Sequence, residues 1–207
     1  MRWNRLIAGG GPAVVAAAIS VAVYDRLPEM LPIHWDAHGV ADGFAPKALA
    51  LSLFPLTALF TGAIMSWAME KATKPRYADL STASTGAFML LMHGQLVWAG
   101  THPPHGLHTG LLMSAIGVLT GIIGFVMPHL SQNRWAGVKT PWTLADEVNW
   151  KVTHRFAARS MVAGGVVAAL AGLLLPGALG FWIGFTGVML GGLLPVPYSY
   201  LIHRMRR

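Results

Sequence analysis

The residues best suited to chemistry lie in two polar stretches of an otherwise apolar chain. The first stretch, LPIHWDAHGVAD, places His34, Asp36, His38 and Asp42 within nine residues. Imidazoles and carboxylates at this density could bind Zn²⁺ or Cu²⁺, although the spacing differs from the HExxH motif of metallohydrolases. Two interpretations stay open. One is a metal site on His34, Asp36 and His38, and the other is a structural pair of His34 with Asp42 that holds a turn at Gly39.

The second polar stretch, GVKTPWTLADEVNWKVTHR, combines a turn with a helix start. Gly137 permits a tight turn, and Pro141 holds the preceding Thr140 in an extended conformation. Thr143 stands three residues before Asp146, a spacing typical of a helix N-cap. The sequence therefore predicts an amphipathic helix that begins at Thr143 and continues into the next apolar segment.

Tryptophans and hydrogen-bonding groups are dense around this helix. Trp135, Trp142 and Trp150 are of the residue type that anchors helices at a membrane interface. The simplest interpretation is a helix near the lipid headgroups, and the alternative is a binding surface or a polar plug between helices. The polar residues concerned are Asn133, Thr140, Asn149, Thr153, His154 and Arg155.

The rest of the chain has the composition of a membrane protein. Of its 207 residues 54% are apolar and 11% are charged, whereas soluble domains carry about 25% charged residues. It contains no cysteine, which excludes disulfides and thiolate sites. We predict an all-α, polytopic bundle of six transmembrane helices, each near the ~20 residues that a bilayer requires. The six segments are Leu6–Tyr24, Ala48–Met69, Ala83–Gly100, Gly110–Met127, Ala157–Leu175 and Leu179–Ile202.

The distribution of basic residues predicts the orientation. Of the 15 Lys and Arg residues, 13 precede the first segment, lie in the second and fourth loops with their flanks, or follow the last segment. By the positive-inside rule both termini are cytoplasmic, loop 25–47 faces outward and loop 128–156 faces inward. The basic excess is thus topological, and we expect no nucleic-acid partner. The terminal HRMRR is expected to meet anionic lipid headgroups. The next outward loop adds His102, His105 and His108 to the candidate ligands.

Because each half has three helices, the two halves cross the membrane in opposite orientations, as the halves of an inverted-topology repeat do. We expect one membrane domain over residues 1–207, with halves 1–100 and 101–207. Within the third segment, His93 and Gln95 are buried polar residues that need partners. A helix-packing hydrogen bond is one role for them. The other is to line a polar cavity between the halves of a small transporter or flippase.

The stretch NRWAGVKTPWTLADEVNWKVTHRFAAR resembles the signature of the SdpI family of multi-spanning membrane proteins. That signature runs from an Asn through Gly, an aliphatic residue, Arg, Thr-Pro-Trp-Thr-Leu and Trp to Thr-His-Arg. Lys139 stands where Arg is usual. The matching positions are Asn133, Gly137, Val138, Thr140, Pro141, Trp142, Thr143, Leu144, Trp150, Thr153, His154 and Arg155.

The outward stretch resembles the Pro-x-His-aromatic-Asn-x-x-Gly-x-x-Asp motif of a domain of unknown function that commonly precedes the SdpI signature. Its matching positions are Pro32, His34, Trp35, Gly39 and Asp42. Asp36 stands where Asn is usual. Two motifs in the expected order, on opposite membrane faces, make the resemblance specific.

The resemblance implies a non-enzymatic protein of the bacterial plasma membrane that gives immunity to a secreted peptide toxin of the sporulation-delay type. It also implies a role in membrane signalling through a cytoplasmic regulator. Two alternatives remain: the transporter or flippase, and a membrane-embedded enzyme assisted by a metal at His34, Asp36 and His38. We expect no cofactor unless Zn²⁺ or Cu²⁺ binds there. The expected partners are the lipid bilayer, the toxin and the regulator.

Overall fold

A computed structural model describes residues 3–102 and 106–206, and it is mostly helical. All six predicted apolar segments lie in helices: α1, α2, α3, α4, α6, and α7 together with α8. The elements are α1 (Trp3–Val23), η1 (Tyr24–Arg26), β1 (Met30–Trp35), β2 (Ala41–Pro46), α2 (Lys47–Ala72), α3 (Pro75–Thr101), α4 (Thr109–Val126), η2 (Met127–His129), α5 (Pro141–Ala145), α6 (Glu147–Leu174), α7 (Gly177–Leu193) and α8 (Pro195–Met205).

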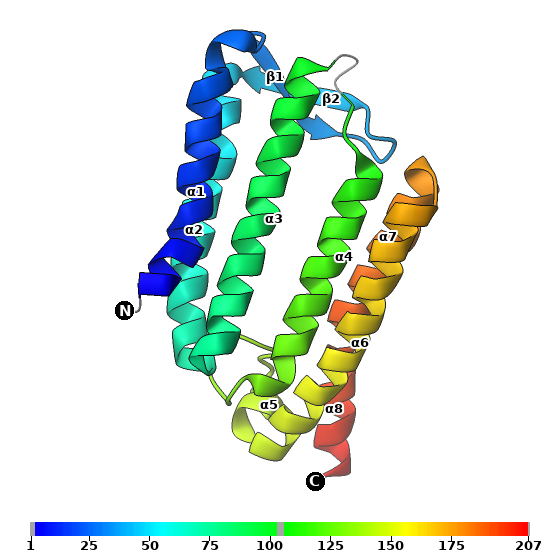
Figure 1. Cartoon of the computed structure of the whole chain (residues 1–207). Coiled ribbons are helices and arrows are strands. Elements are labelled where there is room, and N and C mark those ends of the chain that lie inside the picture. The colour runs from blue at the N-terminus through cyan, green and yellow to red at the C-terminus, as the bar shows by residue number, and fades with distance from the viewer. Residues whose placement is uncertain (1–2, 103–105, 207) are drawn as a thin grey trace.

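The helices form two groups that stand side by side (Figure 1). Helices α1, α2 and α3 pack against one another, as do α4, α6 and α7, and the groups adjoin along α3 and α4. The strands lie at one end of the bundle, and α5 lies at the other, toward which both termini point (Figure 1). Each group follows the order helix, polar connection, helix, helix. This order agrees with the inverted repeat, which stays a prediction.

Close packing inside each group depends on small residues. A Cβ atom on Gly62 of α2 would overlap the backbone of Gly9 in α1, and one on Gly164 of α6 would overlap the backbone of Gly187 in α7. Glycine at these positions lets the helix backbones touch, which is how helices associate when the solvent is as apolar as their side chains.

The outer surfaces of the helices are apolar. Val21 is 80% exposed and Leu174 is 73% exposed, so large aliphatic side chains face outward. Within the described residues, four helical stretches are long and apolar enough to cross a membrane: Lys47–Ala72, Thr109–His129, Glu147–Leu174 and Gly177–Met205. Such surfaces are those of a multi-pass membrane protein. Helices α1 and α3 are not among the four, so the count of six crossings stays a prediction.

The all-α fold class needs one correction, because loop 25–47 contains a β-hairpin. Strands β1 and β2 pair antiparallel, with a register irregularity around His34. The turn between them has Gly39 at φ +82°, a conformation that favours glycine. Leu31 of β1 is fully buried and packs with residues of the helix ends, including Leu96 of α3. The hairpin forms because it buries one apolar edge on the bundle and leaves its polar side chains exposed.

Candidate functional site

The connection from α4 to α6 and the first two turns of α6, together residues 127–154, are called the motif loop below. Its turn is built around Gly137, which has φ +112°. The N–H of Val138 donates to Nε2 of His154 over 3.1 Å, and Nδ1 of His154 lies 2.8 Å from the carbonyl oxygen of Trp150. Since Nε2 must accept, the imidazole is neutral and carries its proton on Nδ1. The rings of Trp150 and His154 stack at 4.0 Å. A Cβ on residue 137 would overlap Nε2 of His154.

The helix start differs from the prediction. Thr140, not Thr143, is the N-cap: its side chain accepts from the N–H of Thr143, whose own side chain accepts from the N–H of Thr140. Pro141 then occupies the first helical position, where its missing N–H costs nothing. The helix α5 ends after one turn, and Asp146 caps a second helix, α6, by accepting from the N–H of Val148. The expected continuous helix is therefore two helices.

The hydroxyl of Thr143 is fully buried and donates to the carbonyl of Val138 over 2.7 Å. Upstream, Oδ1 of Asn133 accepts from the N–H groups of Trp135 and Ala136, which forms a tight turn. Lys139 donates to the carbonyl of Trp135. These hydrogen bonds explain why most of the polar residues of the motif are present: they hold the loop in its folded conformation. Arg155, in contrast, is exposed on α6.

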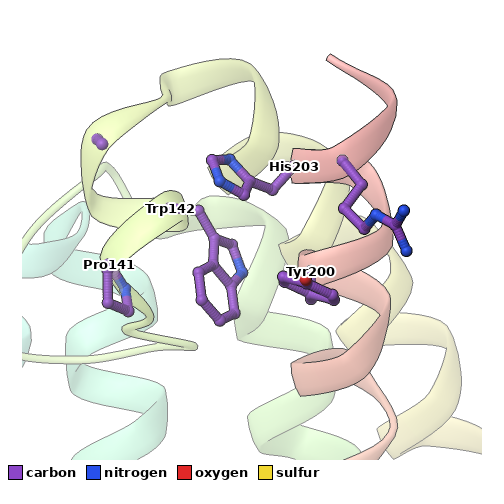
Figure 2. A pocket seen from close by; sticks show the side chains of 6 residues that line it. Pro141, Trp142, Tyr200 and His203 are labelled. Carbon is purple, nitrogen blue, oxygen red and sulfur yellow. The ribbon is translucent and has the colours of Figure 1, made fainter. Parts of the chain in front are cut away.

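Trp142 joins the motif loop to α8. Its Nε1–H donates to Oγ of Ser199 over 2.7 Å, and its ring stacks on His203 with centroids 5.7 Å apart. Asn149 of α6 donates to the carbonyl of Ser199 over 3.0 Å. Figure 2 shows the indole standing between Pro141 and Tyr200, at the edge of a groove of about 500 Å³. The lining residues are Pro141, Trp142, Ala145, Tyr200, His203 and Arg204.

The charged C-terminal residues also contact the motif loop. Nε of Arg206 donates to Oδ2 of Asp146 over 2.8 Å. This bond to Arg206, together with the N–H of Val148, holds the pKa of Asp146 below its ordinary value. The tail predicted to meet lipid headgroups therefore also contacts the motif loop: His203 stacks on Trp142 of α5, and Arg206 bonds to Asp146, the N-cap of α6.

The three tryptophans have different roles. Trp135 is 44% exposed and meets Trp67 edge-on at 4.4 Å, with the ammonium of Lys71 over both rings. Trp142 is half-buried. Trp150 is 1% exposed and donates to the carbonyl of Leu130 over 3.0 Å, so its predicted role as an interfacial anchor is wrong. It is a core residue of this end of the bundle.

The motif loop also connects the two helix groups. The N–H and Oγ of Ser131 both lie 2.9 Å from the carbonyl oxygen of Ala72, at the end of α2. Thr73 returns a bond of 2.6 Å from its hydroxyl to the carbonyl of His129. At the opposite end, the N–H of Leu107 donates to the carbonyl of Gly39 over 2.9 Å, which joins the hairpin to the start of α4. The two helix groups are thus joined by hydrogen bonds at both ends of the bundle.

Comparisons with known proteins match both the motif loop and the hairpin region. A family model described as the SdpI/YfhL protein family matches residues 129–199, and a domain of unknown function, DUF1648, matches residues 13–59. The chain is 30% identical over 152 residues to the immunity protein SdpI of Bacillus subtilis (strain 168), which covers 73% of each chain. The chain belongs to the SdpI/YfhL family. No solved structure matches it.

In this SdpI/YfhL member, the polar side chains of the hairpin form two separate pairs. Nδ1 of His34 lies 2.5 Å from Oδ1 of Asp42, across the strands. Oδ1 of Asp36 accepts from the N–H groups of His38 and Val40, both at 2.9 Å, and its other oxygen lies 3.6 Å from Nδ1 of His38. The N–H of Val40, and then that of His38, lower the pKa of Asp36. The first pair is the one expected from the structural interpretation.

The two apolar residues of the hairpin motif, Pro32 and Trp35, pack against the helix bundle. Pro32 is fully buried, and Trp35 packs against the apolar cluster around Leu31. Over the described part of the chain, no three His, Asp or Glu side chains converge as a metal site would require. His105, one of the candidate ligands, lies outside the described residues.

His93 and Gln95 point to different neighbours. Nε2 of His93, which is fully buried, lies 3.1 Å from Oγ of Ser20 in α1. Oε1 of Gln95 instead accepts from the N–H of His108 over 3.3 Å, before α4. The groove between α3 and α4, of about 350 Å³, is lined by apolar side chains except for Ser84 and Ser114. Among the described residues, His93 and Gln95 therefore contact different partners and do not line the groove between α3 and α4 together.

The residues of α8 that complete the site were not predicted. Ser199, Tyr200 and His203 lie 57 to 61 positions beyond Trp142 in the sequence. The available signal was their spacing, since positions 199, 200 and 203 share one face of a helix. That face could have been identified as one that packs against a partner helix.

Proposed function

We propose that this protein gives immunity to a secreted, membrane-active antimicrobial peptide, as its family resemblance implies. The observation that carries the proposal is the similarity to the immunity protein SdpI over 73% of each chain. The similarity is supported by the motif loop, in which signature residues bond to one another or to α8. A role without catalysis fits this loop, because its polar groups are engaged in the fold.

The protein acts from the bacterial plasma membrane, which it crosses six times with both termini in the cytoplasm. The support for this topology is the charge distribution. Of the 15 Lys and Arg residues, 13 belong to the termini and to the loops and flanks at the α5 end of the bundle. The positive-inside rule places that end in the cytoplasm. The hairpin then faces outward, on the side from which a secreted peptide arrives.

The mechanism we propose is interception of the peptide by the outward face. The hairpin and the outer helix ends meet the peptide in the outer leaflet, before it can disturb the bilayer. The motif loop holds the two helix groups together through Ser131 and Ala72 while this happens. A cytoplasmic regulator, which the family resemblance also implies, would meet the α5 end.

Expression in a toxin-sensitive bacterium tests the proposal. Cells that carry the protein should survive challenge with a sporulation-delay-type peptide toxin better than cells with an empty vector. Membrane fractionation and immunoblotting must show that the protein is inserted. Equal survival of the two strains, with insertion demonstrated, would refute the immunity role. Reporter fusions at both termini and at Asp42 test the topology independently, since they should report the cytoplasm twice and the exterior once.

A further inference from the structure

A third groove, distant from the motif loop, runs between α1 and α2 beside the hairpin. Its volume is about 640 Å³. Two stripes of five residues line it, each at the spacing i, i+3, i+4, i+7 and i+8, which is one helical face. The first stripe is Ala17, Ser20 and Val21 of α1 with Tyr24 and Asp25 of η1, and the second, on α2, is Ala48, Leu51, Ser52, Pro55 and Leu56. At 1.5 Å per residue, the groove extends for roughly 12 Å.

The walls of the groove offer apolar surface. Small side chains such as Ala17 and Ala48 create the hollow. Both serine hydroxyls are bonded to the backbone: Oγ of Ser52 donates to the carbonyl of Leu49 over 2.7 Å, and Oγ of Ser20 lies 3.1 Å from the carbonyl oxygen of Leu51. A ligand that packs against this part of the groove therefore needs an apolar face.

One charged side chain, that of Asp25, is among the residues that line the groove. Asp25 is exposed, and within the described residues its charge interacts with that of Lys47 without a salt bridge. The nearby cation Lys47 is already engaged, because its Nζ lies 3.0 Å from Oε1 of Glu29 and 4.6 Å from the ring centre of Tyr24. The hairpin connection as a whole, residues 25–47, holds four Asp and Glu against two Lys and Arg. A positive group on the ligand is favoured at this position.

We propose that the α1–α2 groove binds an amphipathic, cationic peptide, with apolar side chains between the helices and a Lys or Arg beside Asp25. The inference rests on the proposed function and gives the peptide a binding site. Apolar and basic faces on one helix are the common design of peptides that attack bilayers. A phospholipid tail fits the walls equally well, but its phosphate would meet the carboxylate of Asp25, the one charged side chain that lines the groove. The charge of Asp25 therefore favours the peptide.

Direct binding tests the groove. The full-length protein is placed in phosphatidylcholine nanodiscs and titrated with a fluorescent synthetic amphipathic helix of Leu and Lys. Saturable binding above that of empty nanodiscs is expected. Ala17→Trp fills the groove and should weaken the binding about tenfold or more. Ala18→Trp is the matched control, because Ala18 is also exposed on α1, one residue away, but does not line the groove. Asp25→Asn should weaken the binding and reduce its dependence on salt.

Four results would overturn the inference: no saturable binding, equal binding of a peptide with Glu in place of Lys, full affinity in Ala17→Trp, or equal losses in Ala17→Trp and Ala18→Trp. Matching elution and melting profiles of the two variants exclude misfolding as the cause. The survival assay separates the two proposals. If the wild-type protein binds the peptide but does not protect, only the immunity role fails. If it protects and Ala17→Trp protects equally, only the groove assignment fails.

Discussion

Replacement of Gly137 by Ala should destabilise the α5 end of the bundle. The residue has φ +112°, and a Cβ there would overlap Nε2 of His154 and lie 3.2 Å from the ring of Trp150. Backbone strain costs about 1–3 kcal/mol. Displacement of the imidazole leaves the half-buried N–H of Val138 without its acceptor, which costs a further ~1–2 kcal/mol. We therefore expect a loss of about 2–5 kcal/mol in the free energy of unfolding.

The assay is thermal unfolding in a mild detergent, followed by intrinsic tryptophan fluorescence, since Trp150 is part of the disturbed site. A loss of this size lowers Tm by roughly 4–20 °C in a chain of this length. Two variants serve as controls. Gly177→Ala tests positive φ alone, because φ is +47° and no atom lies within 4 Å of the new Cβ. Gly94→Ala lies in open space on α3 and should not lower Tm. If Gly137→Ala lowers Tm no more than Gly177→Ala, the contact with His154 is not what requires glycine.

Two further predictions concern α8. Trp142→Phe keeps an aromatic ring beside His203 but removes the hydrogen-bond donor to Ser199, so Tm should fall by about 2–8 °C, which corresponds to about 1–2 kcal/mol. Trp142→Ala also removes the ring and should lower Tm further. Equal Tm values for the two variants would contradict this account. The lowered pKa of Asp146 means that its bond to Arg206 stabilises the fold above the ordinary carboxyl pKa, near 4, and is lost as the pH falls through the lower folded value. The difference in Tm between the wild-type protein and Asp146→Asn should therefore shrink from pH 7 to pH 3, and a constant difference would show that the pair is not the cause.

The sequence was sufficient to predict the long helices, because an apolar segment long enough to cross a bilayer adopts few structures other than a helix. It was less sufficient for the start of the motif helix. Thr140 and Thr143 both fit an N-cap, and the decision depends on Pro141, whose preference for the first helical position identifies Thr140. The hairpin was missed because its strands are short and its apolar residues face the bundle on one edge only.

Long-range partners were beyond local patterns. Ser199 binds Trp142 across 57 residues, and no spacing rule connects the two. The divergence of His93 and Gln95, in contrast, was predictable. Residues two apart on a helix are separated by about 200°, so the pair could not have lined one cavity. The pairing of His34 with Asp42 was also accessible from the sequence, since a turn at Gly39 brings the two sides of a hairpin together.

The junctions at the two ends of the bundle, Ser131 with Ala72 and Gly39 with Leu107, hold the two helix groups in a fixed position relative to each other. Between them, α3 and α4 leave an apolar groove. In a bilayer that is thinner or thicker than the apolar part of a helix, a single helix would adapt by tilting, at a cost of a fraction of a kcal/mol per Å. Here neither helix group can tilt alone without breaking a junction. A change in membrane thickness should therefore change the tilt of both helix groups together. Bilayers made from lipids of different chain length would impose such a change.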